Sequence, residues 1–268
     1  MIELSAKQIQ WFSGSDGKAT DLSKIQNTLQ NSLIFLLGEN HDRADHHQWQ
    51  RDTLTFIHKT KKDVAVGFEM LPRRLQPVLD QLCGTSFDKE EFSRKTDWSN
   101  VWGFDLDHYW PLIQYCRDHT LPMIALNCNR PLVTKIGKEG WESQSRTIME
   151  GISPAKSATN TYRRYLFEVT GGCRPGRAAR NPLDPAFDRF VRAQQVWDRA
   201  FACAIADYRK KSPNFSIVGI IGRGHLEYFG GTPYQLEDLN LSCTVLLPVE
   251  NPEECIGAAH FVSLVADE

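Results

Sequence analysis

Short apolar runs recur along the chain, and stretches with helical spacing of apolar residues lie between most of them. The runs have the length of buried strands and span residues 33–37, 64–68, 122–126, 216–221 and 243–247. The helical stretches cover about residues 44–59, 72–82, 88–120 and 185–208. This alternation predicts an α/β fold with a mostly parallel sheet flanked by helices, in which 243–247 is the last strand.

The alternation breaks between about residues 141 and 184. No strand-like run occurs there, and the glycines and proline of 171–176 indicate a loop. We interpret 141–184 as a small, mostly helical lobe inserted into a single domain that spans residues 1–268, a length that one large domain accommodates.

Polar residues follow directly after four of the apolar runs. Glu39 and His41 follow the first run, Glu69 the second, Asn127 the third and His225 the fourth. Because ligands of open α/β sheets sit outside the carboxyl ends of the strands, these side chains are expected to share one site. Each residue alone has a structural explanation, but their joint placement favours a functional pocket.

Composition narrows the classes of function. The formal net charge of −2 gives no indication of general binding to nucleic acid or to an anionic membrane. No apolar run approaches the length of a membrane span. The chain starts with no basic leader or apolar signal segment, and its 7 cysteines form no CxxC pair. These features predict a cytoplasmic protein with reduced cysteines.

The motifs at the strand ends resemble those of the ChaN-like haem-binding proteins. The wider superfamily also holds Tiki-type metalloproteases and erythromycin esterase-like hydrolases. The matching segments occur in the family order and are 38–41 with 46–47, 67–70, 125–127, 194–198 and 222–225 with 231–233. The resemblance covers about residues 30–236 and implies a parallel sheet flanked by helices, plus a small helical lobe. The pair His46-His47 is expected to lie on a helix surface, with at most one of the two facing the pocket.

The resemblance implies binding of haem or a similar iron-porphyrin, in haem or iron handling. Family haem binding is associated with tyrosine ligands at a homodimer interface, and Tyr109 matches a family tyrosine. Haem also needs an apolar slot and basic partners for its propionates. Asn127 would contribute a hydrogen bond to such a ligand at the sheet edge.

The predicted lobe offers further groups of the kinds that haem needs. Tyr162, Arg163, Arg164 and Tyr165 are consecutive, and segment 161–180 carries 5 arginines against one acid. The other three arginines of this segment are Arg174, Arg177 and Arg180. The composition is consistent with an anionic ligand near the lobe, but composition alone favours a solvated basic loop.

Hydrolysis of ester or amide bonds is the alternative function. Glu39, His41, Glu69 and His225 supply two carboxylates and two imidazoles, which can perform acid–base chemistry near neutral pH. The esterase-like relatives also depend on His and Glu after strands. The absence of a Gly-x-Ser-x-Gly elbow disfavours a serine-triad esterase.

A divalent metal such as zinc is the third hypothesis. His41, Glu69 and His225 are the donor types of a catalytic zinc site with an open position. The Tiki-type relatives favour this hypothesis. The sequence contains no HExxH helix, and spacing alone does not bring the three residues together.

Overall fold

The computed structural model describes residues 9–142, 144, 149–173, 175–176 and 178–265. Its strands form one sheet in the order β1-β7-β6-β2-β5-β3-β4, and every neighbouring pair is parallel except β1 and β7. The strands are β1 (Trp11–Ser13), β2 (Ile34–Glu39), β3 (Val64–Pro72), β4 (Met123–Asn127), β5 (Ser216–Gly222), β6 (Thr244–Val249) and β7 (Phe261–Leu264).

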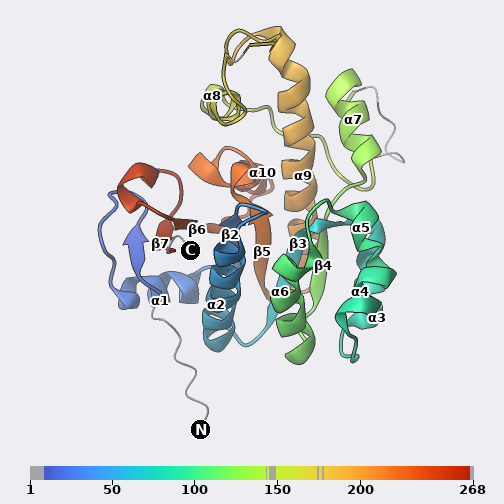
Figure 1. Ribbon diagram of the computed structural model, residues 1–268, viewed down its shortest axis with the longest axis vertical. Helices are drawn as coiled ribbons and strands as arrows, with labels where there is room; N and C mark the ends of the chain where they lie inside the picture. The colour runs from blue at the N-terminus through green and yellow to red at the C-terminus, as the bar shows by residue number, and fades with distance from the viewer. Residues whose placement is uncertain (1–8, 143, 145–148, 174, 177, 266–268) are drawn as a thin grey trace.

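Helices cover both faces of this sheet (Figure 1). The α-helices are α1 (Leu22–Asn31), α2 (Ala44–Thr60), α3 (Gln76–Leu82), α4 (Lys89–Thr96), α5 (Trp98–Val101), α6 (Leu106–Asp118), α7 (Arg130–Glu139), α8 (Asn160–Val169), α9 (Asp188–Lys211) and α10 (Thr232–Asp238). Short 3-10 turns are η1 (Arg73–Leu75), η2 (Pro185–Phe187), η3 (Arg223–His225), η4 (Glu227–Phe229) and η5 (Pro252–Cys255).

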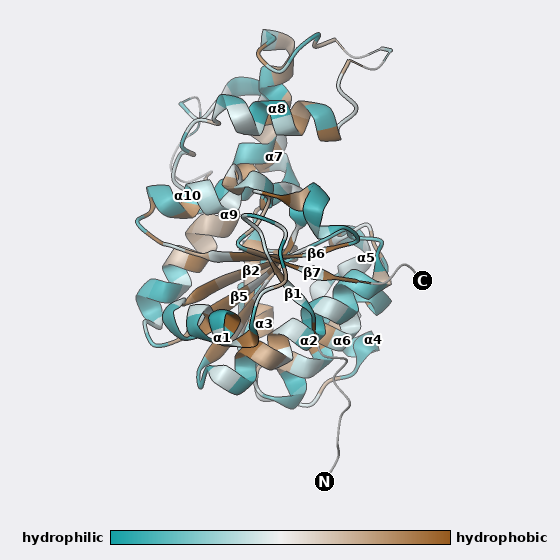
Figure 2. Cartoon of the chain, turned by 90° about the vertical axis from the view of Figure 1, so that its left-hand side faces the viewer, coloured by the Kyte–Doolittle hydropathy of each residue, from teal (hydrophilic) through white to brown (hydrophobic). Residues whose placement is uncertain are grey.

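The strands are apolar on both sides because each side packs against helices. Along β2, Phe35 and Leu37 join the core that holds α2 and α6, whereas Ile34 and Leu36 join the core that holds α9 and α10. Figure 2 shows the hydrophobic strands enclosed between the two helical layers. Burial on both faces explains why the strands read as continuous apolar runs rather than alternating ones.

The predicted α/β fold with a mostly parallel sheet is confirmed, and all five apolar runs are strands, β2 to β6. The prediction that 243–247 is the last strand is wrong, because β7 follows β6 and pairs with it. Strand β7 has only 4 residues, one of them Ser263, and β1 has only 3. Strands this short leave too few positions for a recognisable pattern.

The lobe stands above the sheet and is formed around α8 (Figure 1). Within 141–184, α8 is the single α-helix among the described residues. Its buried residues pack against Phe187 and Val191, so the start of α9 belongs to the lobe as well. Gly171 and Gly172 both have positive φ and end α8, which explains why 170–184 is a loop rather than a helix.

No helix in the described part of the chain combines the length and the apolar character that crossing a bilayer requires.

Candidate functional site

Glu39 and His41 form a carboxylate–imidazole pair at the end of β2. Glu39 is the last residue of the strand and is 1% exposed, and its Oε1 lies 2.6 Å from Nδ1 of His41. The His41 ring contacts Trp102 and Phe104, each at a centroid distance of 5.0 Å. Burial lowers the pKa of His41, but the hydrogen bond to Glu39 and the charges of Glu69 and Glu39 outweigh it and raise the pKa.

Gly222, the last residue of β5, lets this imidazole lie directly over the strand end. It is paired in register with Glu39. A Cβ atom at Gly222 would lie 2.7 Å from Cε1 of His41, which is closer than real atoms approach. The Gly222 amide also donates a hydrogen bond of 2.5 Å to Oε2 of Glu69. A glycine therefore allows His41 and Glu69 to meet above the same residue.

Glu69 reaches the site because β3 is irregular at this point. The register between β3 and β4 shifts between Phe68 and Pro72, so Glu69 lies inside the long strand rather than after it. The Nδ2 of Asn127 donates to the Glu69 carbonyl at 2.7 Å, and the Asn127 Oδ1 accepts from the Cys128 amide at 2.8 Å. Asn127 thus satisfies the backbone of the irregular segment.

His225 forms a second pair with a carboxylate, that of Asp198 on α9. The Nδ1 of His225 lies 2.9 Å from Oδ1 of Asp198, and its Nε2 lies 3.8 Å from Oε1 of Glu69. Burial lowers the pKa of His225, but the charge and hydrogen bond of Asp198, with the charge of Glu69, raise it to about 9. Asp198 itself is fully buried and also accepts a hydrogen bond from Thr232 at 3.2 Å.

The site therefore contains two carboxylate–imidazole pairs on either side of Glu69. Each carboxylate binds the Nδ1 of its histidine, which directs the Nε2 atom away from it. Both pKa values are raised, so each imidazole holds its proton more strongly than a free histidine does. Such an arrangement is able to donate protons to a bound ligand.

Two histidines of α2 lie behind this site. His46 and His47 are 2% and 3% exposed, so the expectation that they lie on a helix surface is wrong. The Nδ1 of His46 accepts from the Asn40 amide at 3.0 Å, and burial lowers the pKa of His46 to about 4. His47 packs against Tyr109 at a centroid distance of 4.4 Å. Both rings support the loop that carries His41.

Lobe tyrosines reach the sheet edge from above. The Tyr162 hydroxyl donates to Oδ2 of Asp198 at 2.8 Å, and the ring is 1% exposed. The Tyr165 hydroxyl makes a short hydrogen bond to Oε2 of Glu227, whose Oε1 accepts from Nε of Arg223 at 2.7 Å. The structure thus brings both lobe tyrosines against the segment that contains His225.

The other residues expected to bind a cofactor lie elsewhere. Tyr109 is fully buried in the core beside His47. The Arg163 guanidinium bonds to the Pro182 carbonyl at 2.9 Å and to Asp188 at 2.8 Å, so it is engaged within the lobe. Arg164 is exposed, and Arg174 and Arg177 lie outside the described residues.

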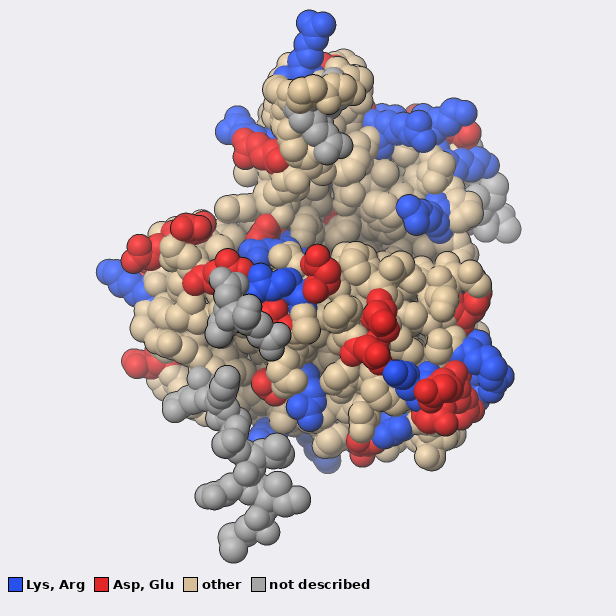
Figure 3. Space-filling view, viewed as in Figure 1, with Lys and Arg blue, Asp and Glu red and all other residues tan. Residues whose placement is uncertain are grey.

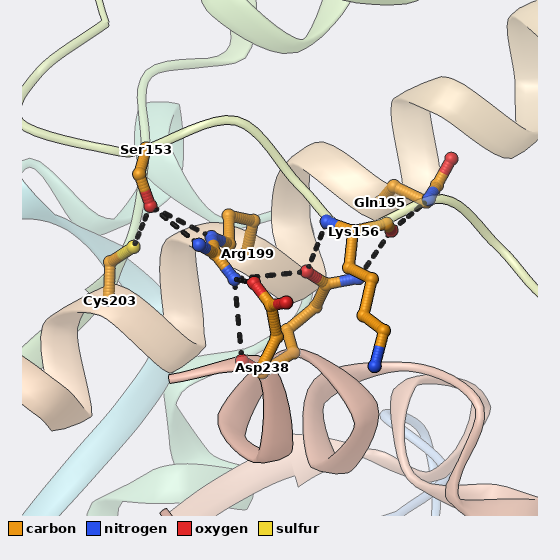
Figure 4. Close-up of polar contacts among 7 residues, drawn as sticks. Ser153, Lys156, Gln195, Arg199, Cys203 and Asp238 are labelled. Atoms are coloured by element: carbon orange, nitrogen blue, oxygen red, sulfur yellow. Dashed lines mark hydrogen bonds and ion pairs between the residues drawn. The ribbon is translucent and has the colours of Figure 1, made fainter. Parts of the chain in front are cut away.

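A buried polar network fixes the segment that leads into the lobe (Figure 4). Arg199 of α9 is 4% exposed and donates to Oγ of Ser153 from Nε and Nη2, at 3.0 and 2.7 Å. Its Nη1 lies 2.7 Å from Oδ2 of Asp238. The Lys156 carbonyl accepts from Gln195 at 2.6 Å. These contacts hold the lobe segment against α9 and α10.

Comparison with known proteins identifies the family. A family model described as haem-binding uptake, Tiki superfamily, ChaN matches residues 25–236. The chain belongs to this family. No curated protein sequence matches it.

Solved structures similar to the chain include one of a ChaN protein. The structure that describes cofacial haem binding to ChaN of Campylobacter jejuni matches this chain with a TM-score of 0.74. The two chains are 18% identical, and 97% of each is covered. A mutant of the erythromycin esterase EreC in its open conformation has a TM-score of 0.49, with 12% identity over 96% of this chain and 84% of that chain. The type III effector HopBA1 has a TM-score of 0.49, with 10% identity over 97% of each chain. The likeness to the ChaN structure confirms the fold.

The donor set for a metal is not assembled in this member of the ChaN family. Among the described residues, no group of three or more His, Cys, Asp or Glu side chains is arranged to hold a metal ion. His41, Glu69 and His225 instead bind their neighbours, and the Nε2 of His225 is 3.8 Å from the nearest Glu69 oxygen. The described residues therefore give no support to a zinc site.

Two site residues of this ChaN-family chain were not assigned a role from its sequence. Asp198 belongs to the motif 194–198 and Arg223 to the motif 222–225, so both lie in segments that resemble the family motifs. In the sequence Asp198 cannot be told apart from a solvent-facing helix residue. Its role becomes clear only from the packing of α9 against the end of β5, where it contacts His225. Burial lowers the pKa of Arg223, but the charge and hydrogen bond of Glu227 outweigh it and raise the pKa.

Proposed function

We propose that this protein binds haem between the lobe and the sheet edge, in haem or iron handling. Membership of the ChaN family supports this function. The observation that carries it is the position of Tyr165, whose hydroxyl lies against Glu227 at the edge of the sheet. Haem, when bound, supplies an iron that takes an axial oxygen ligand such as a tyrosine.

Tyr165 and its neighbours fit the needs of a haem ligand. Burial and the charge of Glu227 raise the pKa of Tyr165, so the free phenol keeps its proton. Oε2 of Glu227 is placed to accept that proton when the phenol oxygen becomes a ligand. The Tyr165 ring contacts Tyr228 at a centroid distance of 5.4 Å, and Tyr228 is 42% exposed. Arg223, bound to Glu227, adds a cation for a propionate.

The test is a haemin titration of the apo protein, followed by absorbance. We expect a saturable Soret shift at fixed stoichiometry, and for Tyr165→Phe an affinity lower by about tenfold or more. Tyr115→Phe is the matched control, because Tyr115 bonds to His58 on α2 and is not part of the site. A weak, non-saturating change in the wild type would reject haem binding. An unchanged titration of Tyr165→Phe would reject Tyr165 as the ligand.

The same titration also tests whether haem binding is coupled to formation of a homodimer. The resemblance favours a homodimer with haem at the interface, and light scattering with and without haemin measures that association. One haem per chain with a mass that doubles on binding supports a haem-linked dimer. A monomer at saturation excludes it.

A hydrolase is the second candidate, and a separate observation supports it. The pairs Glu39–His41 and Asp198–His225 face Glu69, and haem ligation by Tyr165 uses none of these groups. The Nε2 of His41 or His225 would move a proton to or from a bound water or leaving group. Screening esters and amides with the wild type, His41→Ala and Glu69→Gln tests this function. If His41→Ala and Glu69→Gln lose hydrolysis but bind haemin as the wild type does, the two functions use different residues. If both variants lose haem binding equally, the two functions use the same residues.

A further inference from the structure

Two adjacent aromatic residues that follow His225, Tyr228 and Phe229, have left-handed backbone conformations. Their φ angles are 54° and 57°. Among the described residues other than glycine, they are the one adjacent pair with positive φ. A bulky side chain in this conformation crowds its own backbone and costs free energy, whereas glycine adopts it freely. Residues of this kind persist where the surrounding structure fixes them, and they cluster at functional sites.

Core packing explains the conformation of Phe229 but not that of Tyr228. The Phe229 ring packs against His260 at a centroid distance of 4.8 Å and against the core that holds α9 and α10. Tyr228 is 42% exposed, more than any other Phe, Tyr or Trp side chain in the described part of the chain. Its amide donates to the Ala258 carbonyl at 3.0 Å, which fixes the turn. The turn therefore presents the Tyr228 ring to solvent at a cost in free energy that burial of this ring does not offset.

The exposed ring lies beside Tyr165, the residue proposed above as the haem ligand. The rings of Tyr165 and Tyr228 are 5.4 Å apart between centroids, with their planes inclined at 60°. Glu227, which accepts a hydrogen bond from the Tyr165 hydroxyl, directly precedes Tyr228 in the chain. A porphyrin bound through its iron at the Tyr165 oxygen extends well beyond this separation, so its plane comes within reach of the Tyr228 ring.

Charge alone does not account for recognition of a porphyrin at this place. Figure 3 shows basic and acidic side chains close together on the body just below the lobe. The Arg223 guanidinium is paired with Glu227, with its Nε 2.7 Å from Oε1. A cation that already has a carboxylate partner attracts a propionate less strongly than a free cation does, because the carboxylate repels it. Contact with the macrocycle is therefore needed beside the charges, and an exposed aromatic ring provides it by stacking.

We propose that Tyr228 stacks on the macrocycle of a porphyrin bound at Tyr165, so that this site binds iron-free porphyrins as well as haem. The inference rests on the proposed haem function for the place of the ligand. Stacking uses the π-system of the macrocycle and does not need the iron. The two tyrosines thus have separate roles, because Tyr165 binds the iron and Tyr228 binds the ring system that surrounds it.

The test is a pair of absorbance titrations of the full chain, one with haemin and one with iron-free protoporphyrin IX. The wild type should bind both saturably. Tyr228→Asn should bind each of them about tenfold more weakly, because it removes the stacked ring. Tyr165→Phe should weaken the binding of haemin alone, since phenylalanine keeps the ring but has no oxygen for the iron. Tyr228→Phe is the matched variant, which keeps the ring and should bind both ligands as the wild type does.

A stability measurement separates a ligand contact from a role in folding. Asparagine tolerates positive φ, so Tyr228→Asn should have a urea unfolding midpoint at least as high as that of the wild type. Thr120→Asn is the control, because Thr120 is exposed, has a φ of 54° and lies outside the site. It should keep its stability and bind both ligands as the wild type does. A midpoint of Tyr228→Asn clearly below that of the wild type would assign Tyr228 to packing and overturn the proposal.

The titrations distinguish failure of this inference from failure of the proposed function. Unchanged binding of both ligands by Tyr228→Asn would overturn the inference, as would saturable binding of haemin without binding of protoporphyrin IX. In both cases the haem function itself stands. Binding of protoporphyrin IX that Tyr228→Asn weakens, without saturable binding of haemin, would support the role of Tyr228 and reject iron ligation by Tyr165.

Discussion

The hydroxyl of Tyr162 donates a hydrogen bond of 2.8 Å to Asp198, the same carboxylate that binds His225. The Tyr162 ring lies directly over Gly230, where a Cβ atom would be 2.6 Å from the ring. Lobe and sheet edge are thus joined at a buried contact beside the two carboxylate–imidazole pairs. Any displacement of α8 changes the environment of His225.

Tyr162→Phe should lower the free energy of unfolding by about 1–3 kcal/mol, because it leaves a buried carboxylate oxygen without its donor. The measurement is urea unfolding of the variant and of the wild type. Tyr228→Phe is the control, since Tyr228 is 42% exposed and its loss of a hydroxyl should cost almost nothing. Equal stabilities of the two variants would contradict the role of the Tyr162 hydroxyl.

Stability should fall as pH rises from about neutral to alkaline. Asp198 and Glu69 raise the pKa of His225 to about 9 in the folded protein, from 6.5 in the unfolded chain. The resulting stabilisation is fully present below pH 6.5 and is lost as pH rises through the folded pKa. The loss should be about 3 kcal/mol, measured by urea unfolding across this range. His225→Gln should reduce the pH dependence between neutral pH and the onset of cysteine ionisation in the unfolded chain, and a wild type more stable at alkaline pH would contradict the prediction.

Gly222→Ala should displace His41 while the sheet stays folded. The added Cβ would lie 2.7 Å from Cε1 of His41, so the ring must move away from Glu69. We expect a loss of stability of about 1–3 kcal/mol and a change in the pKa of His41 measured by NMR titration. Gly103→Ala is the control, because nothing lies within 4 Å of the Cβ position there. An unchanged His41 titration in Gly222→Ala would refute the contact.

Arg199→Met should destabilise the fold. It removes the Arg199 donor from the Ser153 hydroxyl and from the buried Gln235 amide oxygen, which should cost about 1–3 kcal/mol, whereas the pair with the exposed Asp238 adds little. Unfolding measurements should show this loss, and limited proteolysis should cut the segment before α8 more quickly than in the wild type. Arg94→Met, at an exposed position, should change neither result.

The sequence predicted most of the sheet because each central strand is buried on both faces. Such strands are continuous apolar runs, as in β2 and β5, and they are recognisable without knowing their neighbours. The edge strand β1 and its neighbour β7 have only 3 and 4 residues, which are too few for an apolar run to be recognised in the sequence.

The floor of the site could be predicted for a related reason. Glu39 and His225 lie at or beyond their strand ends, Glu69 lies near the carboxyl end of β3, and parallel strands bring such positions to one edge. The partner of His225 could not be predicted in this way. Asp198 is in the middle of a 24-residue helix, and nothing in its spacing indicates that this residue rather than a neighbour faces β5. The tyrosines of the lobe likewise depend on how α8 is oriented, which its sequence does not specify.

The pairing of Glu39 with Gly222 joins residues that are far apart in the order of synthesis. Proteins emerge from the ribosome amino end first, so the chain carries His41 and Glu69 for most of its translation without the strand that separates β2 from β3. The site cannot form in a partly made or truncated chain. A nascent chain that ends before β5 would therefore have no ligand pocket and no continuous sheet. The exposed edges of β2 and β3 would be open to aggregation until β5 inserts between them.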